Sequence, residues 1–150
     1  MPRPTKYRKV ECFPCEACFG PYEKEKEGLE EIELKIEELE AMRLKDIAEF
    51  SQEQCAEKMD VSRQTFQNII DSARKKVAIA LTEGKIINIR GGNYLPKQCI
   101  YLCKVCGETY QPSTEFDISN CPKCGSQMVM CCSTEKECKR WCQCHEIKLK

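Results

Sequence analysis

The stretch from Ser51 to Val77 constrains the fold most, because it predicts two helices separated by a three-residue turn. Ser51 is a favourable N-cap for the first helix, and Ser62, at the end of the turn, is a favourable N-cap for the second. Apolar residues recur at three- and four-residue spacing, so one face of each helix is expected to be buried. These residues are Cys55, Ala56 and Met59 in the first helix and Phe66, Ile69, Ile70, Ala73, Val77 and Leu81 in the second. The pattern is typical of a helix-turn-helix.

The opposite face of the second helix is polar near its N-terminus, the end that meets base edges when such a helix binds DNA. Arg, Gln and Asn are the residue types that read bases. The expected base-reading and anchoring residues are Ser62, Arg63, Gln64, Thr65, Gln67 and Asn68, and the expected phosphate contacts are Arg74, Lys75 and Lys76. The alternative is an ordinary helical hairpin whose polar face meets water.

The run from Ile36 to Leu81, with the opening MPRPTKYRKV and the GGNY at Gly91 to Tyr94, carries a resemblance to known proteins. It resembles the promoter-reading C-terminal domain of bacterial sigma factors. More closely, it is similar to a prokaryotic family of predicted DNA-binding proteins, domain of unknown function 134. The resemblance covers about the first 94 residues and implies DNA binding. Asp60 departs from the family by replacing its usual turn glycine, and Cys15 and Cys18 add thiols that the family typically lacks.

Fourteen cysteines in a chain without an apolar signal segment indicate metal or redox chemistry, since the cytosol disfavours disulfides. Cys103 and Cys106 form one Cys-x-x-Cys knuckle, and Cys121 and Cys124 form another after fourteen residues. Each knuckle is followed by a glycine that relieves the tight backbone. Four thiolates at this spacing predict a structural zinc ribbon, whose closed tetrahedral site leaves no position for catalysis.

Two further groups of cysteines have less decisive spacing. Those near the C-terminus predict either a second zinc site or free, redox-active thiols; the group is Cys131, Cys132, Cys138, Cys142 and Cys144, with His145. Those near the N-terminus, Cys12, Cys15 and Cys18, have the local spacing of three ligands of an iron-sulfur cluster, with Cys99 or a tail cysteine as the fourth. A loop that binds zinc or no metal is the preferred interpretation.

The net charge of zero conceals a segregation along the chain. Residues 1–10 carry four basic and no acidic groups, whereas residues 11–50 carry thirteen acidic and five basic groups. The opening Pro-Arg-Pro segment therefore predicts either a minor-groove arm or a disordered tail, with Arg3, Lys6, Arg8 and Lys9 as its cations. The nine glutamates between residues 23 and 40 are expected to form a solvated face that points away from DNA.

The segment from Gly28 to Phe50 admits two readings, because residues 30–36 fit both a helix and a strand. The β-branched run at residues 85–90 favours a small β ribbon with residues 32–36, followed by a helix from about Glu37 to Glu49. The expected fold is therefore mainly α, with a helix-turn-helix domain carrying a small β ribbon and a C-terminal zinc-ribbon module. The expected domains are residues 1–29 (basic arm and cysteine loop), 30–95 (helix-turn-helix) and 96–150 (ribbon and tail).

These features predict a cytoplasmic DNA-binding protein that acts as a transcriptional regulator and has double-stranded DNA as its partner. The alternatives are a metal- or redox-sensing regulator that uses the extra cysteines, and an adaptor that binds the transcription machinery. No membrane partner is expected, because the chain lacks an apolar run long enough to cross a bilayer. The sequence leaves the oligomeric state open, a homodimer included. An enzyme is not expected, since the chain has a single histidine and no phosphate-binding glycine loop.

Overall fold

The structure, a computed structural model, describes residues 6–25, 27–96 and 99–132, which fall into two compact units. We call Cys12–Gly92 the helical unit, and Met1–Glu11 together with Asn93–Lys150 the ribbon unit. The division differs from the expected domains 1–29, 30–95 and 96–150. Its physical reason is that the N-terminal strand pairs with the segment after Asn93, so residues distant in sequence share one unit.

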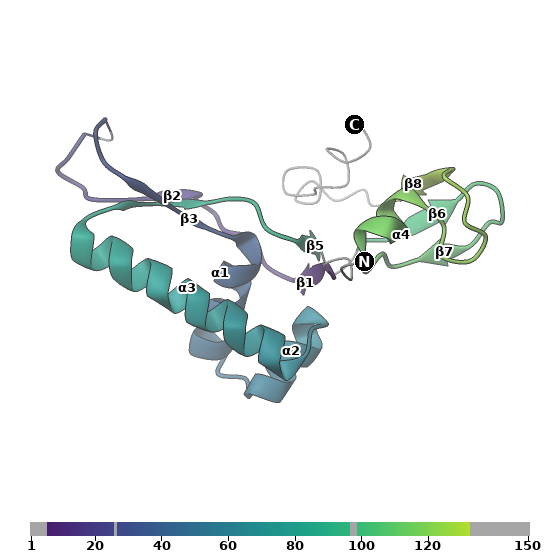
Figure 1. Cartoon of the computed structure of the whole chain (residues 1–150), viewed down its shortest axis with the longest axis horizontal. Helices are drawn as coiled ribbons and strands as arrows, with labels where there is room; N and C mark the ends of the chain where they lie inside the picture. Colours follow the sequence, from purple (N-terminus) through teal and green to yellow (C-terminus); the bar gives the residue numbers. More distant parts are fainter. Residues whose placement is uncertain (1–5, 26, 97–98, 133–150) are drawn as a thin grey trace, which may run out of the picture. The chain divides into compact units, whose positions relative to one another are not determined.

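The helical unit contains a three-stranded sheet in the order β2-β4-β3. The strands are β2 (Cys18–Phe19), β3 (Glu31–Leu34) and β4 (Ile86–Ile89). β3 and β4 run parallel, with Ile32 opposite Ile87. The expected pairing of these segments is confirmed, and residues 31–34 are a strand. Parallel neighbours require a crossover connection, which the helices between β3 and β4 provide (Figure 1).

The crossover begins with α1 (Ile36–Met42), which continues without a break into the π-helix η1 (Arg43–Ile47). The Ala48 amide donates to the Arg43 carbonyl at 2.9 Å, the five-residue spacing of a π turn. α2 (Gln52–Met59) and the long α3 (Arg63–Glu83) follow. The helix expected from about Glu37 to Glu49 is thus present as an α segment and a π segment.

The turn between α2 and α3 has the geometry that its residues favour. Asp60 ends α2 in the left-handed region, with φ 56° and ψ 47°, a conformation that Asp tolerates better than most residues. Ser51 accepts from the Gln54 amide at 3.2 Å in a capping box, and Ser62 accepts from the Thr65 amide at 3.1 Å. Both predicted N-caps are confirmed.

The expected apolar faces of α2 and α3 form the core of the helical unit. The buried cluster joins both helices to α1 and η1 and contains Ala41, Leu44, Cys55, Ala56, Met59, Phe66, Ile69 and Ile70. One expected core residue is wrong: Leu81 is 76% exposed, and Ala80 is buried in its place. The reason is that the last turn of α3 packs against the rest of the helical unit at Ala80, one residue before the position that the helical period predicted to be buried.

The expectation that the glutamates of residues 23–40 form a solvated face is also partly wrong. Glu37, Glu38 and Glu40 are buried in α1, each less than 5% exposed. Polar partners stabilise two of them in the interior: Glu38 accepts from Lys76, and Glu40 accepts from Arg43. A buried carboxylate is tolerated when it is paired and hydrogen-bonded, as these two are.

The ribbon unit contains two small sheets. In the first, β1 (Arg8–Val10) runs parallel to β5 (Tyr94–Pro96). In the second, of order β7-β6-β8, β6 (Tyr101–Cys103) lies antiparallel to β7 (Thr109–Tyr110) and β8 (Val129–Cys131), and α4 (Glu115–Ser119) connects β7 to β8 (Figure 1). The core of this unit consists of Tyr7, Leu95, Cys99, Tyr101 and Ile118.

The expected free basic arm is not what residues 6–10 form. The Tyr7 amide donates to the Ser113 carbonyl at 2.8 Å, and Tyr7 is only 6% exposed. Arg8 and Lys9 lie in β1. Backbone pairing therefore holds this segment against the ribbon unit, whereas Arg3 lies outside the described residues.

The prediction of a mainly α fold is wrong, because the described residues are mixed α and β. They carry eight strands in three sheets beside the helices, and strands occur in both units. These strands have two to four residues each. So short a strand contains too few positions for a two-residue period to stand out, whereas the long period of α3 is conspicuous.

Candidate metal centre and candidate nucleic-acid interface

The two Cys-x-x-Cys segments adopt the same backbone turn. The Gly107 amide donates to the Cys103 carbonyl at 3.0 Å, and the Gly125 amide donates to the Cys121 carbonyl at 2.8 Å. Both glycines have φ 76°, a left-handed conformation that strains residues with a side chain. The sequence thus dictates two matching knuckles, one after β6 and one before β8, each of which turns two thiols in the same direction.

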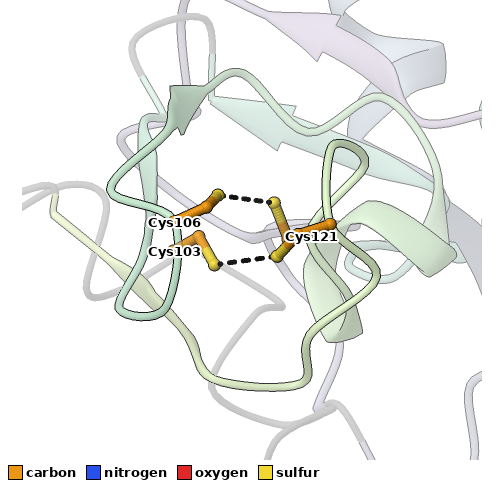
Figure 2. A group of neighbouring side chains, drawn as sticks. Cys103, Cys106 and Cys121 are labelled. Atoms are coloured by element: carbon orange, nitrogen blue, oxygen red, sulfur yellow. Dashed lines mark hydrogen bonds between the residues drawn. The ribbon is translucent and has the colours of Figure 1, made fainter.

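The knuckles bring four sulfur atoms together. All four Sγ atoms lie within 4.8 Å of one another. The Sγ atoms of Cys103 and Cys124 are 3.6 Å apart, and those of Cys106 and Cys121 are 3.7 Å apart (Figure 2). A tetrahedral ion with bonds of about 2.3 Å to sulfur holds its ligands about 3.8 Å apart. The cluster therefore has the chemistry and spacing of a closed four-thiolate metal site.

The electrostatics of the cluster also favour a cation. The Cys106 backbone amide, the strongest influence, lowers the pKa of the Cys103 thiol to about 6. At Cys124 the Ser126 amide acts in the same direction, but burial and the neighbouring thiols raise the pKa to about 12. Thiolates this close repel one another, so they do not all ionise unaided. A divalent ion at the centre compensates that repulsion and lets every sulfur act as a ligand.

The other cysteine groups do not form such a cluster among the described residues. Cys12, Cys15 and Cys18 are exposed, and Cys18 lies in β2, opposite Asn88. Cys99, the suggested fourth ligand, is buried in the core of the ribbon unit, where it packs as an apolar residue. Cys131 is the last residue of β8 and Cys132 follows it. The remaining expected ligands of the second site, Cys138, Cys142, Cys144 and His145, lie outside the described residues.

The first two turns of α3 present the expected polar face. Arg63, Gln64 and Asn68 are exposed, and Gln64 donates to Asn68 at 3.0 Å. Arg63 contacts α2: its guanidinium lies 3.2 Å from a Glu53 carboxylate oxygen, and both side chains are about two-thirds exposed. Gln67 also contacts α2, by accepting from the side-chain amide of Gln52. Side-chain hydrogen bonds thus hold this face of α3 against α2.

The three cations further along α3 have different surroundings. Arg74 pairs with Asp46 of η1 at 2.6 Å, and the hydrogen bond that its guanidinium donates to Asp46 raises the pKa of the guanidinium. Lys76 pairs with the buried Glu38 at 2.6 Å. Lys75 is exposed and has no ion-pair partner among residues 6–25, 27–96 and 99–132. Arg74 and Lys76 therefore contribute to the packing of α3, which the sequence did not indicate.

The partners of Arg74 and Lys76 are residues that sequence reasoning missed. Glu38 and Asp46 lie in the acidic stretch before α2, more than twenty-five positions from the lysine or arginine that each contacts. Helical spacing relates only residues three or four apart, so it carried no signal for these pairs. Only the packing of α1 and η1 against α3 brings them together.

Comparison with known proteins identifies relatives over nearly the whole chain. The model of the family described as protein of unknown function DUF134 matches residues 1–97. A UPF0251 protein of Clostridium botulinum, strain Loch Maree, is 61% identical over 143 residues, which are 95% of this chain and 91% of the relative. A UPF0251 protein of Clostridium tetani is 57% identical over 145 residues, 97% of this chain and 99% of the relative. No solved structure matches.

A membrane-spanning helix is absent from the part of the chain that the structure describes, since no helix there combines the necessary length and apolarity.

Proposed function

The chain belongs to the DUF134 family, and from this premise we propose that it binds double-stranded DNA through α2 and α3 and regulates transcription. The observation that carries the proposal is the exposed N-terminal face of α3. There, base-reading side chains, Arg63, Gln64 and Asn68, directly follow a capped helix start. In a helix of this kind, those positions enter the major groove while the preceding helix crosses the phosphate backbone.

Rigid packing behind this face supports the proposal, since a reading helix must be held in a fixed orientation. Phe66 and Met59 are fully buried between α2, α3 and η1. The left-handed turn at Asp60 sets the angle between the helices without a glycine. The contacts of Arg63 with α2 are exposed, and exposed ion pairs contribute about 0–1 kcal/mol, so exchanging them for a base costs little.

In this proposal Lys75 makes the main phosphate contact. Its side chain is exposed on α3, whereas Arg74 and Lys76 are engaged with Asp46 and Glu38. Arg74 remains 47% exposed and can meet phosphate while it keeps its ion pair. The roles predicted from the sequence are thus kept for Arg63, Gln64, Asn68 and Lys75, and Lys76 becomes a positioning residue.

We further propose that the four-cysteine centre holds zinc as a structural ion. Zinc favours tetrahedral thiolate sites, and the ribbon sheet is too small to be stabilised by its core alone. Cobalt substitution tests the geometry, because a tetrahedral four-thiolate site gives characteristic visible absorption. Cys121→Ser should abolish that spectrum, while Cys18→Ser, which changes an exposed thiol of the other unit, should leave it intact.

The DNA proposal is tested by fluorescence anisotropy with the metal-intact full chain, first on mixed-sequence duplexes and then on a duplex selected from them. Arg63→Ala should weaken binding to the selected duplex by about 1–3 kcal/mol and leave binding to mixed-sequence duplexes nearly unchanged. Lys75→Ala should weaken binding to both kinds of duplex equally. It should also lower the slope of log affinity against log salt concentration by about one. Lys24→Ala, a loss of an exposed lysine far from α3 in sequence, is the matched control.

Two results would contradict the proposal. One is absence of binding by the wild type at about 50 mM salt, where counterion release favours it most. The other is an Arg63→Ala variant that behaves like the Lys24→Ala control. Co-purification of a protein partner alongside absent DNA affinity would instead favour the adaptor.

A further inference from the structure

The helical unit contains a cavity of about 320 Å³ between its N-terminal loop and the α1–η1 segment. This volume lies within the range of small-molecule sites. Its walls are mostly apolar and include Phe13, Pro14, Phe19, Leu39, Ile47 and Ile89. Phe19 and Ile47 are 53% and 78% exposed, so the apolar surface is open to an incoming molecule. Apolar walls of this kind favour an apolar ligand, because binding removes both surfaces from water.

Two thiols line the same cavity. Cys12 and Cys15 are both exposed and both belong to its walls. The Cys12 amide donates to Glu40 of α1 at 3.4 Å, which holds the first thiol-bearing residue beside the helix. Cys18, three residues after Cys15, is also exposed but does not line the cavity. The cavity therefore places two of the three N-terminal thiols, and not the third, beside an apolar binding surface.

The charged residues of the cavity disfavour an anionic ligand. Glu40 and Arg43 form an ion pair at 2.5 Å and so compensate each other. Glu16 adds a further negative charge to the lining and disfavours an anion. Arg43 and Ile47 come from the π-helix η1, and π turns occur frequently at functional sites.

We propose that this cavity binds a small, uncharged, apolar electrophile of the α,β-unsaturated carbonyl class, which Cys12 or Cys15 captures covalently. In the capture step the cysteine sulfur forms a bond to the β-carbon and the carbon–carbon π bond breaks. The proton lost by the thiol is taken up at the α-carbon, so the addition needs no oxidant or reductant. The apolar walls raise the local concentration of the electrophile beside the thiols, which is the source of selectivity.

A regulatory consequence rests on the proposed DNA binding, whereas the capture itself does not. Asp46 lies in the same π turn as the cavity residues Arg43 and Ile47 and pairs with Arg74 of α3. Adduct formation that displaces η1 should therefore alter the support of α3. If the cysteines form adducts but the protein has no DNA affinity, the ligand site is supported and only the DNA proposal is rejected.

The test compares an apolar reagent with a polar one of the same reactive group. N-phenylmaleimide and N-(2-hydroxyethyl)maleimide are each added in limiting amount to the metal-intact full chain, and adducts are quantified by peptide mass spectrometry. Cys18 and Cys132, both exposed and outside the cavity lining, are internal references. The phenyl preference is the ratio of phenyl to hydroxyethyl adducts at one thiol. At Cys12 or Cys15 this ratio should exceed the ratio at the reference thiols about fivefold, the effect of burying roughly 40 Å² of apolar surface.

Two matched variants complete the test. Ile47→Asn should abolish the excess preference, because it replaces an exposed apolar wall of the cavity. Leu81→Asn removes an equally exposed apolar side chain, 76% against 78%, that does not line this cavity, and it should leave the preference unchanged. Equal preferences at all four thiols, or an excess that survives Ile47→Asn, would overturn the proposal.

Discussion

Replacing Glu38 with Gln should destabilise the helical unit, because Glu38 is a buried acceptor for three groups. Its carboxylate accepts from the Lys35 amide at 2.9 Å, from the Ser72 hydroxyl at 2.6 Å and from the Lys76 ammonium at 2.6 Å. The side chain is only 3% exposed. It therefore joins the start of α1 to the middle of α3 through contacts that water screens poorly.

The size of the effect follows from the burial of the two partners. Removing one member of a fully buried ion pair costs about 3–5 kcal/mol, because the other charge is left uncompensated. Lys76 is 29% exposed and regains part of its hydration, and Gln keeps one acceptor oxygen. We therefore expect a loss of about 2 kcal/mol in the free energy of unfolding, below the fully buried range.

Urea denaturation followed by circular dichroism at 222 nm measures this loss in the right unit, since α1, α2 and α3 all lie in the helical unit. Asp46→Asn is the matched control. It breaks the pair with Arg74, which has the same 2.6 Å separation but side chains 42–47% exposed, and it should cost about 1 kcal/mol or less. A double-mutant cycle of Glu38→Gln with Lys76→Met should give a coupling of at least about 1 kcal/mol.

A cost of Glu38→Gln no greater than that of Asp46→Asn would contradict this prediction, because burial would then have no influence on the strength of these pairs. A coupling near zero in the cycle would equally show that the 2.6 Å contact does not stabilise the fold.

Three further predictions concern the turn, the metal and the core. Asp60→Gly should stabilise the helical unit by about 0.5–1 kcal/mol, measured as a rise in Tm, because Asp60 occupies the left-handed region, and unchanged or lower stability would contradict this. Cys103→Ser should remove one equivalent of bound metal in elemental analysis, and a retained equivalent would place the ion elsewhere. Phe66→Ala should cost about 3–5 kcal/mol, because the ring is fully buried. Phe116→Ala, whose ring is 55% exposed, should cost far less, and equal costs would refute the core assignment.

Features with a local physical cause could be predicted from the sequence. The capping serines, the left-handed turn at Asp60 and the buried face led by Phe66 depend on residues a few positions apart. The four-cysteine cluster is similar, since each Cys-x-x-Cys-Gly segment fixes its own turn. The pairing of β3 with β4 was also indicated by the sequence, through the β-branched run after Gly84.

Features that depend on distant segments could not be predicted. The pairing of β1 with β5 joins residues more than eighty positions apart and turned an expected arm into part of the ribbon unit. The exposure of Leu81 likewise depended on where α3 leaves its neighbours, which its period does not reveal.

Short-range interactions determine the α2–turn–α3 segment and the two cysteine knuckles, because capping, turn chemistry and side-chain period act over short separations. Tertiary structure alone decided that the fold is mixed α and β, that Glu38 and Glu40 are buried, and that Cys12 and Cys15 line an apolar cavity. The physical reason is that burial and pairing depend on which surfaces meet in space. A glutamate that is solvated in one packing arrangement becomes a buried acceptor in another, and only the fold selects between them.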